Sequence, residues 1–263
     1  MTPTMHSPLE GNTADAPTKR RLPQLLVGRR AVVTGAARGM GKAIADAFEE
    51  AGATVVRLDL KESDTVRACN VADEASVAHA FEAIAAEGPI NDIVHAAAIA
   101  VVSSVADMAE SEFRRVMDVN LTGSFLVARE AARCLGQGGN LVFIASQGGL
   151  KAWALWGAYC ASKGGVLRLA DSLVEELAPK GIRVNSISPG SVETDMISTT
   201  IADIARQTGS DTQTVRARYE AAIPMGRFAQ PEEIASVAVA ICSDLFSYVN
   251  GSNIVIDGGE LSR

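Results

Sequence analysis

The sequence predicts an α/β protein built on one doubly wound parallel sheet of about seven strands. Short, almost continuous apolar runs alternate with longer stretches of helical periodicity along most of the chain. Strands that are apolar on both faces need helices above and below them, as in a parallel sheet with right-handed crossovers. A chain of 263 residues with 48% hydrophobic content can bury such a core in one domain.

Seven runs rich in β-branched residues are the predicted strands. The third run is the weakest candidate. Near-continuous apolar character within the other runs indicates burial on both faces. In chain order the runs are residues 31–34, 54–58, 66–68, 93–94, 141–144, 182–184 and 254–256.

The first helix is predicted between residues 40 and 51. Met40, Ile44 and Phe48 recur at helical spacing and form one apolar stripe. Gly52 is suited to end this helix, because glycine readily adopts the left-handed conformation found after many helices. A strand, a turn and a helix therefore follow one another here.

Two polar stretches are expected to lie outside the packed core. Residues 1–27 lack apolar periodicity and should form a flexible arm before the domain at residues 28–263. The short basic run at residues 19–21 could contact nucleic acid, but we favour a solvated tail. Residues 194–224 are rich in threonine and alanine and should form a mobile helical lid.

Charge and composition exclude several classes of protein. The net charge of −7 argues against a nucleic-acid or anionic-membrane partner. The four cysteines have no paired spacing, so we expect neither a redox pair nor a metal site. No run approaches the roughly 20 apolar residues of a membrane span, and no secretory signal precedes the domain, so a cytoplasmic protein is expected.

The turn after the first predicted strand carries Gly35, Gly39 and Gly41. Glycines let the backbone turn sharply and approach a pyrophosphate at the N-terminus of the next helix. Alone this is a modest signal, since glycines also mark ordinary turns between strands and helices.

Asp59 follows the second predicted strand and bears on the choice of dinucleotide. A carboxylate there can accept hydrogen bonds from the adenosine ribose and would repel a 2′-phosphate. Arg38 opposes this interpretation because its guanidinium could pair with that phosphate, whereas Leu60 adds no basic group. We expect NAD, with NADP the less favoured cofactor.

Tyr159 and Lys163 lie four residues apart, which a helix converts into neighbours on one face. Oxidation of an alcohol needs a base at the hydroxyl, and a tyrosine with its usual pKa of about 10 needs a nearby cation to ionise. Such a pair alone is more often a surface contact. Ser146 follows a predicted strand, where its hydroxyl could orient a substrate or merely cap a turn.

Taken together, these residues resemble the short-chain dehydrogenase/reductase family. Thr34-Gly35-x-x-x-Gly39-x-Gly41 is similar to the glycine turn of that family. The resemblance covers roughly residues 28–260 and implies a Rossmann-type fold. Further landmarks occur in the expected order, namely Asn120-Leu121-Thr122-Gly123, Ser146, Tyr159-x-x-x-Lys163, Asn185, Pro189 to Thr194, and Asp257-Gly258-Gly259.

The resemblance implies hydride transfer between a nicotinamide cofactor and a secondary alcohol or ketone. It implies catalytic roles for Asn120, Ser146, Tyr159 and Lys163; Lys163 would also bind the nicotinamide ribose, and Asn120 would hold a water in a proton relay. It further implies a homotetramer and, from residues 148–167, a cyclic or hydroxylated substrate of bacterial secondary metabolism. The implied cofactor contacts are Gly35, Arg38, Gly39, Met40, Gly41, Asp59, Leu60, Asn70, Val71, Ala97, Tyr159, Lys163, Pro189, Gly190, Val192 and Thr194.

Two segments depart from the family pattern. Asn70-Val71 stands where Asp-Val is frequent, and its amide oxygen can still accept a hydrogen bond. His95-Ala96-Ala97-Ala98 replaces the usual Asn-Asn-Ala-Gly, and Ala98 adds a methyl group near the expected adenine site. Because His95 follows an apolar strand, we favour a buried structural histidine over a catalytic base.

The sequence allows more than one interpretation of the substrate pocket and of the reaction. Gln147, Trp153 and Trp156 should flank the pocket, although either tryptophan could equally pack in a subunit interface. A catalytically silent NAD sensor is one alternative, suggested by the changed residues 95–98. A dehydratase or epimerase with bound NAD is the other.

Overall fold

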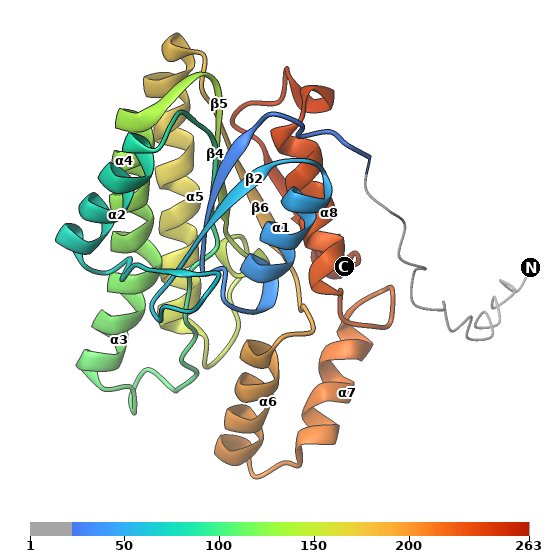
Figure 1. Ribbon diagram of the computed structural model, residues 1–263. Helices are drawn as coiled ribbons and strands as arrows, with labels where there is room; N and C mark the ends of the chain where they lie inside the picture. Colours follow the sequence, from blue (N-terminus) through green and yellow to red (C-terminus); the bar gives the residue numbers. More distant parts are fainter. Residues whose placement is uncertain (1–22, 263) are drawn as a thin grey trace, which may run out of the picture.

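One seven-stranded parallel sheet lies between two layers of helices in the computed structural model, which describes residues 23–262 (Figure 1). The strand order is β3-β2-β1-β4-β5-β6-β7, so the direction of winding reverses between β1 and β4. All seven predicted strands are confirmed. They are β1 (Arg30–Thr34), β2 (Thr54–Asp59), β3 (Arg67–Ala68), β4 (Ile90–His95), β5 (Leu135–Ile144), β6 (Arg183–Pro189) and β7 (Asn253–Ile256).

Alternation along the strands produces two apolar cores. Val33 and Val94 face one helical layer, whereas their neighbours Val32 and Ile93 face the other. Helices α1 (Gly39–Glu50) and α8 (Pro231–Cys242) cover the first face. Helices α2 (Glu74–Ala86), α4 (Gly123–Cys134) and α5 (Gly157–Leu177) cover the second. The doubly wound arrangement follows from these strands being apolar on both sides.

The predicted first helix is confirmed as α1. Gly52, just beyond it, has a φ of +96°, a conformation that glycine adopts without strain. Most of the predicted arm, residues 1–22, lies outside the described residues. Within its last five residues, Leu26 is buried, and its N–H donates to Ala51 O at 2.9 Å. Leu26, which the sequence analysis placed in the arm, therefore packs on the domain.

The stretch predicted as a helical lid contains two helices. Helices α6 (Asp195–Thr208) and α7 (Thr212–Ala222) form a hairpin beyond the carboxyl end of β6, at the bottom of Figure 1. The hairpin has its own small apolar cluster, including Ile201, Val215 and Phe228. Helix α3 (Glu110–Met117) projects from the same end of the molecule.

Candidate active site

The glycine turn between β1 and α1 packs so closely that side chains do not fit. A Cβ on Gly35, whose φ is +68°, would lie 2.8 Å from the N and Cα atoms of Ala97. A Cβ on Gly41 would lie 2.1 Å from Gly35 O. The N-terminus of α1 has no side-chain cap, and its amides and dipole suit a pyrophosphate. The turn therefore fits the dinucleotide expected from the sequence.

Asp59, the last residue of β2, points its carboxylate at the glycine turn. One carboxylate oxygen accepts the N–H of Ala37 at 3.0 Å, and the other accepts the N–H of Leu60 at 2.7 Å. The Arg38 side chain is 80% exposed, and its guanidinium lies 4.0 Å from Asp195 on α6. Arg38 therefore lies within ion-pair distance of the first residue of α6, in the helical hairpin α6–α7, which we call the lid.

Ser146 and Tyr159 meet in one pocket, as their predicted roles require. Ser146 follows β5, Tyr159 lies in the first turn of α5, and both side chains line this pocket. Lys163 is 4% exposed; its Nζ donates to Ile144 O at 2.7 Å and lies 5.8 Å from the centre of the Tyr159 ring. Ser146, just after β5, and Tyr159 and Lys163, both on α5, therefore lie together at the carboxyl edge of the sheet.

Burial governs the ionisation of this pair in the protein without cofactor. Burial of the hydroxyl raises the pKa of Tyr159 to about 12, against the opposing interaction with Ser146. Burial also lowers the pKa of Lys163 to about 8, and the Ile144 carbonyl accepts a hydrogen bond from Lys163 Nζ. The expectation that Lys163 lowers the tyrosine pKa concerns the enzyme with oxidised cofactor bound, and it stays a prediction. Without cofactor, Tyr159 is a phenol near neutral pH.

Asn120 lies in a π-helical turn, Asp118–Thr122, between α3 and α4. Its Oδ1 accepts the N–H of Ile99, and its Nδ2 donates to Ile99 O, both at 2.9 Å. Nδ2 also lies 3.0 Å from the Ser162 hydroxyl on α5. The irregular turn directs this buried amide between the loop after β4 and α5; π-helical turns are frequent at functional sites.

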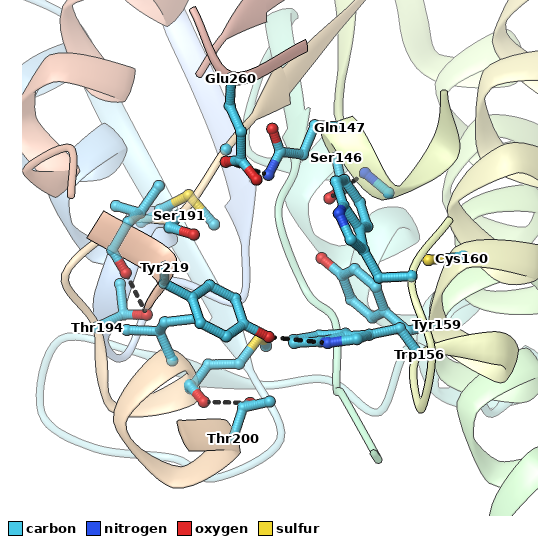
Figure 2. Close-up of a pocket in the computed structure, with 17 residues that line it drawn as sticks. Ser146, Gln147, Trp156, Tyr159, Cys160, Ser191, Thr194, Thr200, Tyr219 and Glu260 are labelled. Atoms are coloured by element: carbon cyan, nitrogen blue, oxygen red, sulfur yellow. Dashed lines mark hydrogen bonds between the residues drawn. The ribbon is translucent and has the colours of Figure 1, made fainter. Parts of the chain in front are cut away.

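The pocket wall opposite the sheet comes from the lid. Figure 2 shows Trp156 and Tyr219 meeting below the Tyr159 hydroxyl, where Trp156 Nε1 donates to Tyr219 Oη at 3.1 Å. Trp156 also packs edge-on against Tyr159, with ring centroids 5.3 Å apart. Trp153 lines the same pocket. Both indoles therefore lie in the pocket wall, one of the two positions that the sequence left open.

The remaining predicted cofactor residues fall into two groups. Four of them line the pocket, namely Met40, Gly190, Val192 and Thr194. Three others do not line it: Asn70 Oδ1 accepts the N–H of Ala72 at 3.1 Å, Val71 is buried, and Pro189 ends β6.

His95 is a buried neutral histidine. It is 3% exposed, its Nδ1 lies 2.8 Å from the Thr34 hydroxyl, and burial lowers its pKa to about 3. The same Thr34 oxygen accepts the N–H groups of Ala96 at 3.2 Å and Ala97 at 3.3 Å. The segment that departs from the family pattern is therefore hydrogen-bonded to the end of β1.

Several pocket residues were not identified from the sequence. Met196, Ile197 and Thr200 on α6, Tyr219 on α7, and Glu260 near the C-terminus all line the pocket. Glu260 directly follows the Asp257-Gly258-Gly259 landmark, which is the one signal that could have drawn attention to it.

Residues 23–262 contain no group of three histidine, cysteine, aspartate or glutamate side chains placed to hold a metal ion. Within the same range, every helix is too short or too polar to cross a membrane.

The doubly wound sheet, the glycine turn at its switch point and the polar site at its carboxyl edge define a dinucleotide-dependent oxidoreductase. A family model described as enoyl-(acyl carrier protein) reductase matches residues 35–260. The chain belongs to the short-chain dehydrogenase/reductase family, whose members act on CH–OH groups.

The named relatives include polyol dehydrogenases, a 3-oxoacyl-[acyl-carrier-protein] reductase and hydroxysteroid dehydrogenases. D-threitol dehydrogenase of Mycolicibacterium smegmatis is 36% identical over 89% of this chain and 93% of its own. NAD-dependent glycerol dehydrogenase of Listeria innocua is 36% identical over 87% and 92%. Ligand-free aldohexose dehydrogenase of Thermoplasma acidophilum superposes with a TM-score of 0.84 at 27% identity, covering 90% of this chain and 96% of that one. An uncharacterized family member of Sinorhizobium fredii is longer, and this chain spans 45% of it at 34% identity.

Proposed function

We propose that the enzyme interconverts a secondary alcohol and its ketone with NAD, and that the substrate is a small cyclic or polyhydroxylated molecule. The observation that carries the proposal is that Ser146 and Tyr159 line one pocket, which also contains Met40, Val192 and Thr194. The threitol, glycerol and aldohexose dehydrogenases support a hydroxylated substrate.

Asp59 supports NAD over NADP as the cofactor. Its carboxylate is held at the end of β2 by two backbone N–H groups, where it can accept ribose hydroxyls and repel a 2′-phosphate. Gly35, Gly41 and the N-terminus of α1 would hold the pyrophosphate, and Val192 and Thr194 would contact the nicotinamide. When bound, the cofactor accepts or donates the hydride and, when oxidised, adds positive charge beside the phenol.

Proton transfer is assigned to Tyr159. In the oxidation direction its oxygen takes the proton of the substrate hydroxyl, and in reduction it returns that proton to the ketone oxygen. Ser146 orients the substrate oxygen by hydrogen bonding. The Lys163 ammonium, near the tyrosine ring, stabilises the phenolate electrostatically. Asn120 positions the loop after β4 against α5, and we retain its proposed place in a proton relay.

Tyr159→Phe tests the mechanism, because it removes the proton donor and keeps the ring. We expect kcat to fall by about 100-fold or more, as for loss of a general acid or base. The readout is the absorbance of reduced nicotinamide across cyclic alcohols and polyols with NAD or NADP. Tyr248→Phe is the matched control, because that ring is fully exposed. Equal rates for Tyr159→Phe and wild type would refute the mechanism.

The same assay separates the alternatives. A silent NAD sensor would show no turnover, and a dehydratase or epimerase would not consume free NAD. The hydrogen bonds between Thr34 and residues 96–97 favour an intact site over the sensor. We also propose a cytoplasmic homotetramer, which light scattering and cell fractionation would test.

A further inference from the structure

One end of the pocket carries a carboxylate that the proposed chemistry does not use. Glu260 lines the pocket, and Figure 2 shows its carboxylate beside Gln147, on the opposite side of the Tyr159 hydroxyl from Trp156 and Tyr219. Gln147 Nε2 donates to Glu260 Oε2 at 2.8 Å. The carboxylate thus faces a cavity that also contains the reacting hydroxyl.

The backbone around Glu260 is fixed by several hydrogen bonds. The Asp257 carboxylate accepts the N–H groups of Gly259 at 2.9 Å and Leu261 at 2.8 Å. The Gly190 N–H donates to Ile256 O at 2.9 Å, and a Cβ on Gly190 would lie 2.9 Å from Asp257 Cα. Glu260 is therefore held on a turn packed against the end of β6.

Gln147 is used to position this carboxylate. Its side chain is buried, and its Oε1 has no hydrogen-bond partner among residues 23–262. A buried acceptor without a hydrogen-bond partner costs free energy. The observed orientation of the Gln147 amide leaves Oε1 in that state, so another interaction of the same amide must favour this orientation. Turning the amide would place two acceptor oxygens together, and the observed orientation instead directs the NH₂ group to Glu260.

The pocket lining carries a negative charge and no positive one. Glu260 is the only charged residue among the described residues that line it, and these include no lysine, arginine or histidine. Two basic side chains lie near the pocket without lining it: Lys163, whose Nζ is 5.8 Å from the centroid of the Tyr159 ring, and Lys151, whose Nζ is 5.9 Å from the centroid of the Trp153 ring. A carboxylate or phosphate placed against Glu260 would meet a like charge, whereas a hydroxyl or ammonium group there could donate to it.

We infer that Glu260, positioned by Gln147, is a specificity-determining residue that selects alcohols bearing a second hydroxyl or an ammonium group near the reacting carbon. The inference rests on the proposed function and adds the class of substrate: neutral polyols and amino alcohols are accepted, and hydroxy acids and phosphorylated alcohols are rejected. Glu260 contacts the substituent next to the reacting hydroxyl, and Tyr159 contacts that hydroxyl itself.

The test uses four alcohols with one ring skeleton: cyclohexanol, 1,2-cyclohexanediol, 2-aminocyclohexanol and 2-hydroxycyclohexanecarboxylate. For wild type, kcat/KM for the diol and the amino alcohol should exceed that for cyclohexanol by about 10-fold, with the carboxylate lowest. Glu260→Gln should reduce the ratio of amino alcohol to carboxylate at least about 10-fold. Gln147→Leu should reduce the ratio of diol to cyclohexanol mainly through KM. Glu176→Gln, an exposed charge change on α5, should leave every ratio unchanged.

The outcomes separate this inference from the proposed function. Turnover with ratios near one, unaffected by Glu260→Gln, overturns the inference and leaves the proposed function standing. If no alcohol is turned over, the proposed function fails, and binding of the same four compounds with NAD is followed by quenching of tryptophan fluorescence. A preference for the amino alcohol that Glu260→Gln abolishes then supports the inference, and equal binding of all four compounds overturns it.

Discussion

The hydrogen bond between Trp156 and Tyr219 should hold the lid closed over the pocket, and Tyr219→Phe removes it. The substitution deletes the oxygen that accepts from Trp156 Nε1 at 3.1 Å and keeps the edge-on contact with Phe228, whose ring centroid is 6.5 Å away. Both partners are partly exposed, so water can replace the lost bond. The expected cost is therefore the net value of one hydrogen bond, about 1 kcal/mol.

That cost corresponds to a lid that opens about fivefold more often. The lid keeps its other attachments, including Gln207 Nε2 to Val102 O at 2.6 Å and the pair of Arg216 with Glu193 at 2.6 Å. Amide exchange should accelerate about fivefold in α6 and α7 and stay constant in α1 and α8. KM should rise by at most the same factor, because the apparent affinity falls only as far as the closed fraction of the lid falls.

Hydrogen exchange read by mass spectrometry is the assay, and tryptophan fluorescence supports it because both tryptophans of the chain line the pocket. Tyr248→Phe again supplies the control. Unchanged exchange in α6 and α7 together with an unchanged KM would show that this bond does not hold the lid.

Three further predictions concern the cofactor site and the buried histidine. Asp59→Ser should raise kcat/KM for NADP relative to NAD by about 10-fold or more, since it removes the carboxylate that would repel a 2′-phosphate. Gly41→Ala should abolish binding of NADH, measured by its fluorescence, because the new Cβ would lie 2.1 Å from Gly35 O. His95→Asn should flatten the pH dependence of stability: burial lowers the pKa of His95 to about 3, so from pH 6.5 down to pH 3 the unfolded chain binds a proton that the folded chain excludes. Wild type should therefore lose about 1.4 kcal/mol more per pH unit below 6.5 than the variant in urea unfolding.

Each of these predictions has an opposing result. An unchanged ratio of NADP to NAD would exclude Asp59 as the residue that selects the cofactor. Normal NADH affinity in Gly41→Ala would mean that the glycine turn adapts to a methyl group. Parallel stability curves for wild type and His95→Asn would mean that the histidine is not held neutral.

The sequence predicted the fold well where strands are apolar on both faces. Val32 and Val33 illustrate why: adjacent residues face opposite helical layers, so both must be apolar. The first part of β5 was missed, because Gly136 and Gly138 have low strand propensity and join the sheet only through their neighbours. Leu26 was assigned to the arm because its burial depends on contact with α1, which local polarity does not reveal.

The candidate site was likewise predictable from the sequence only in part. The spacing of Tyr159 and Lys163 predicted their place on one helix, but it contained no information about ionisation. The pKa of each group depends on burial, and burial favours the neutral forms of both, a phenol for Tyr159 and an amine for Lys163. A phenolate at neutral pH therefore needs positive charge that the protein alone does not place against the hydroxyl. In the proposed mechanism the oxidised cofactor would provide that charge as well as accept the hydride, so cofactor binding would activate the base that the motif predicts.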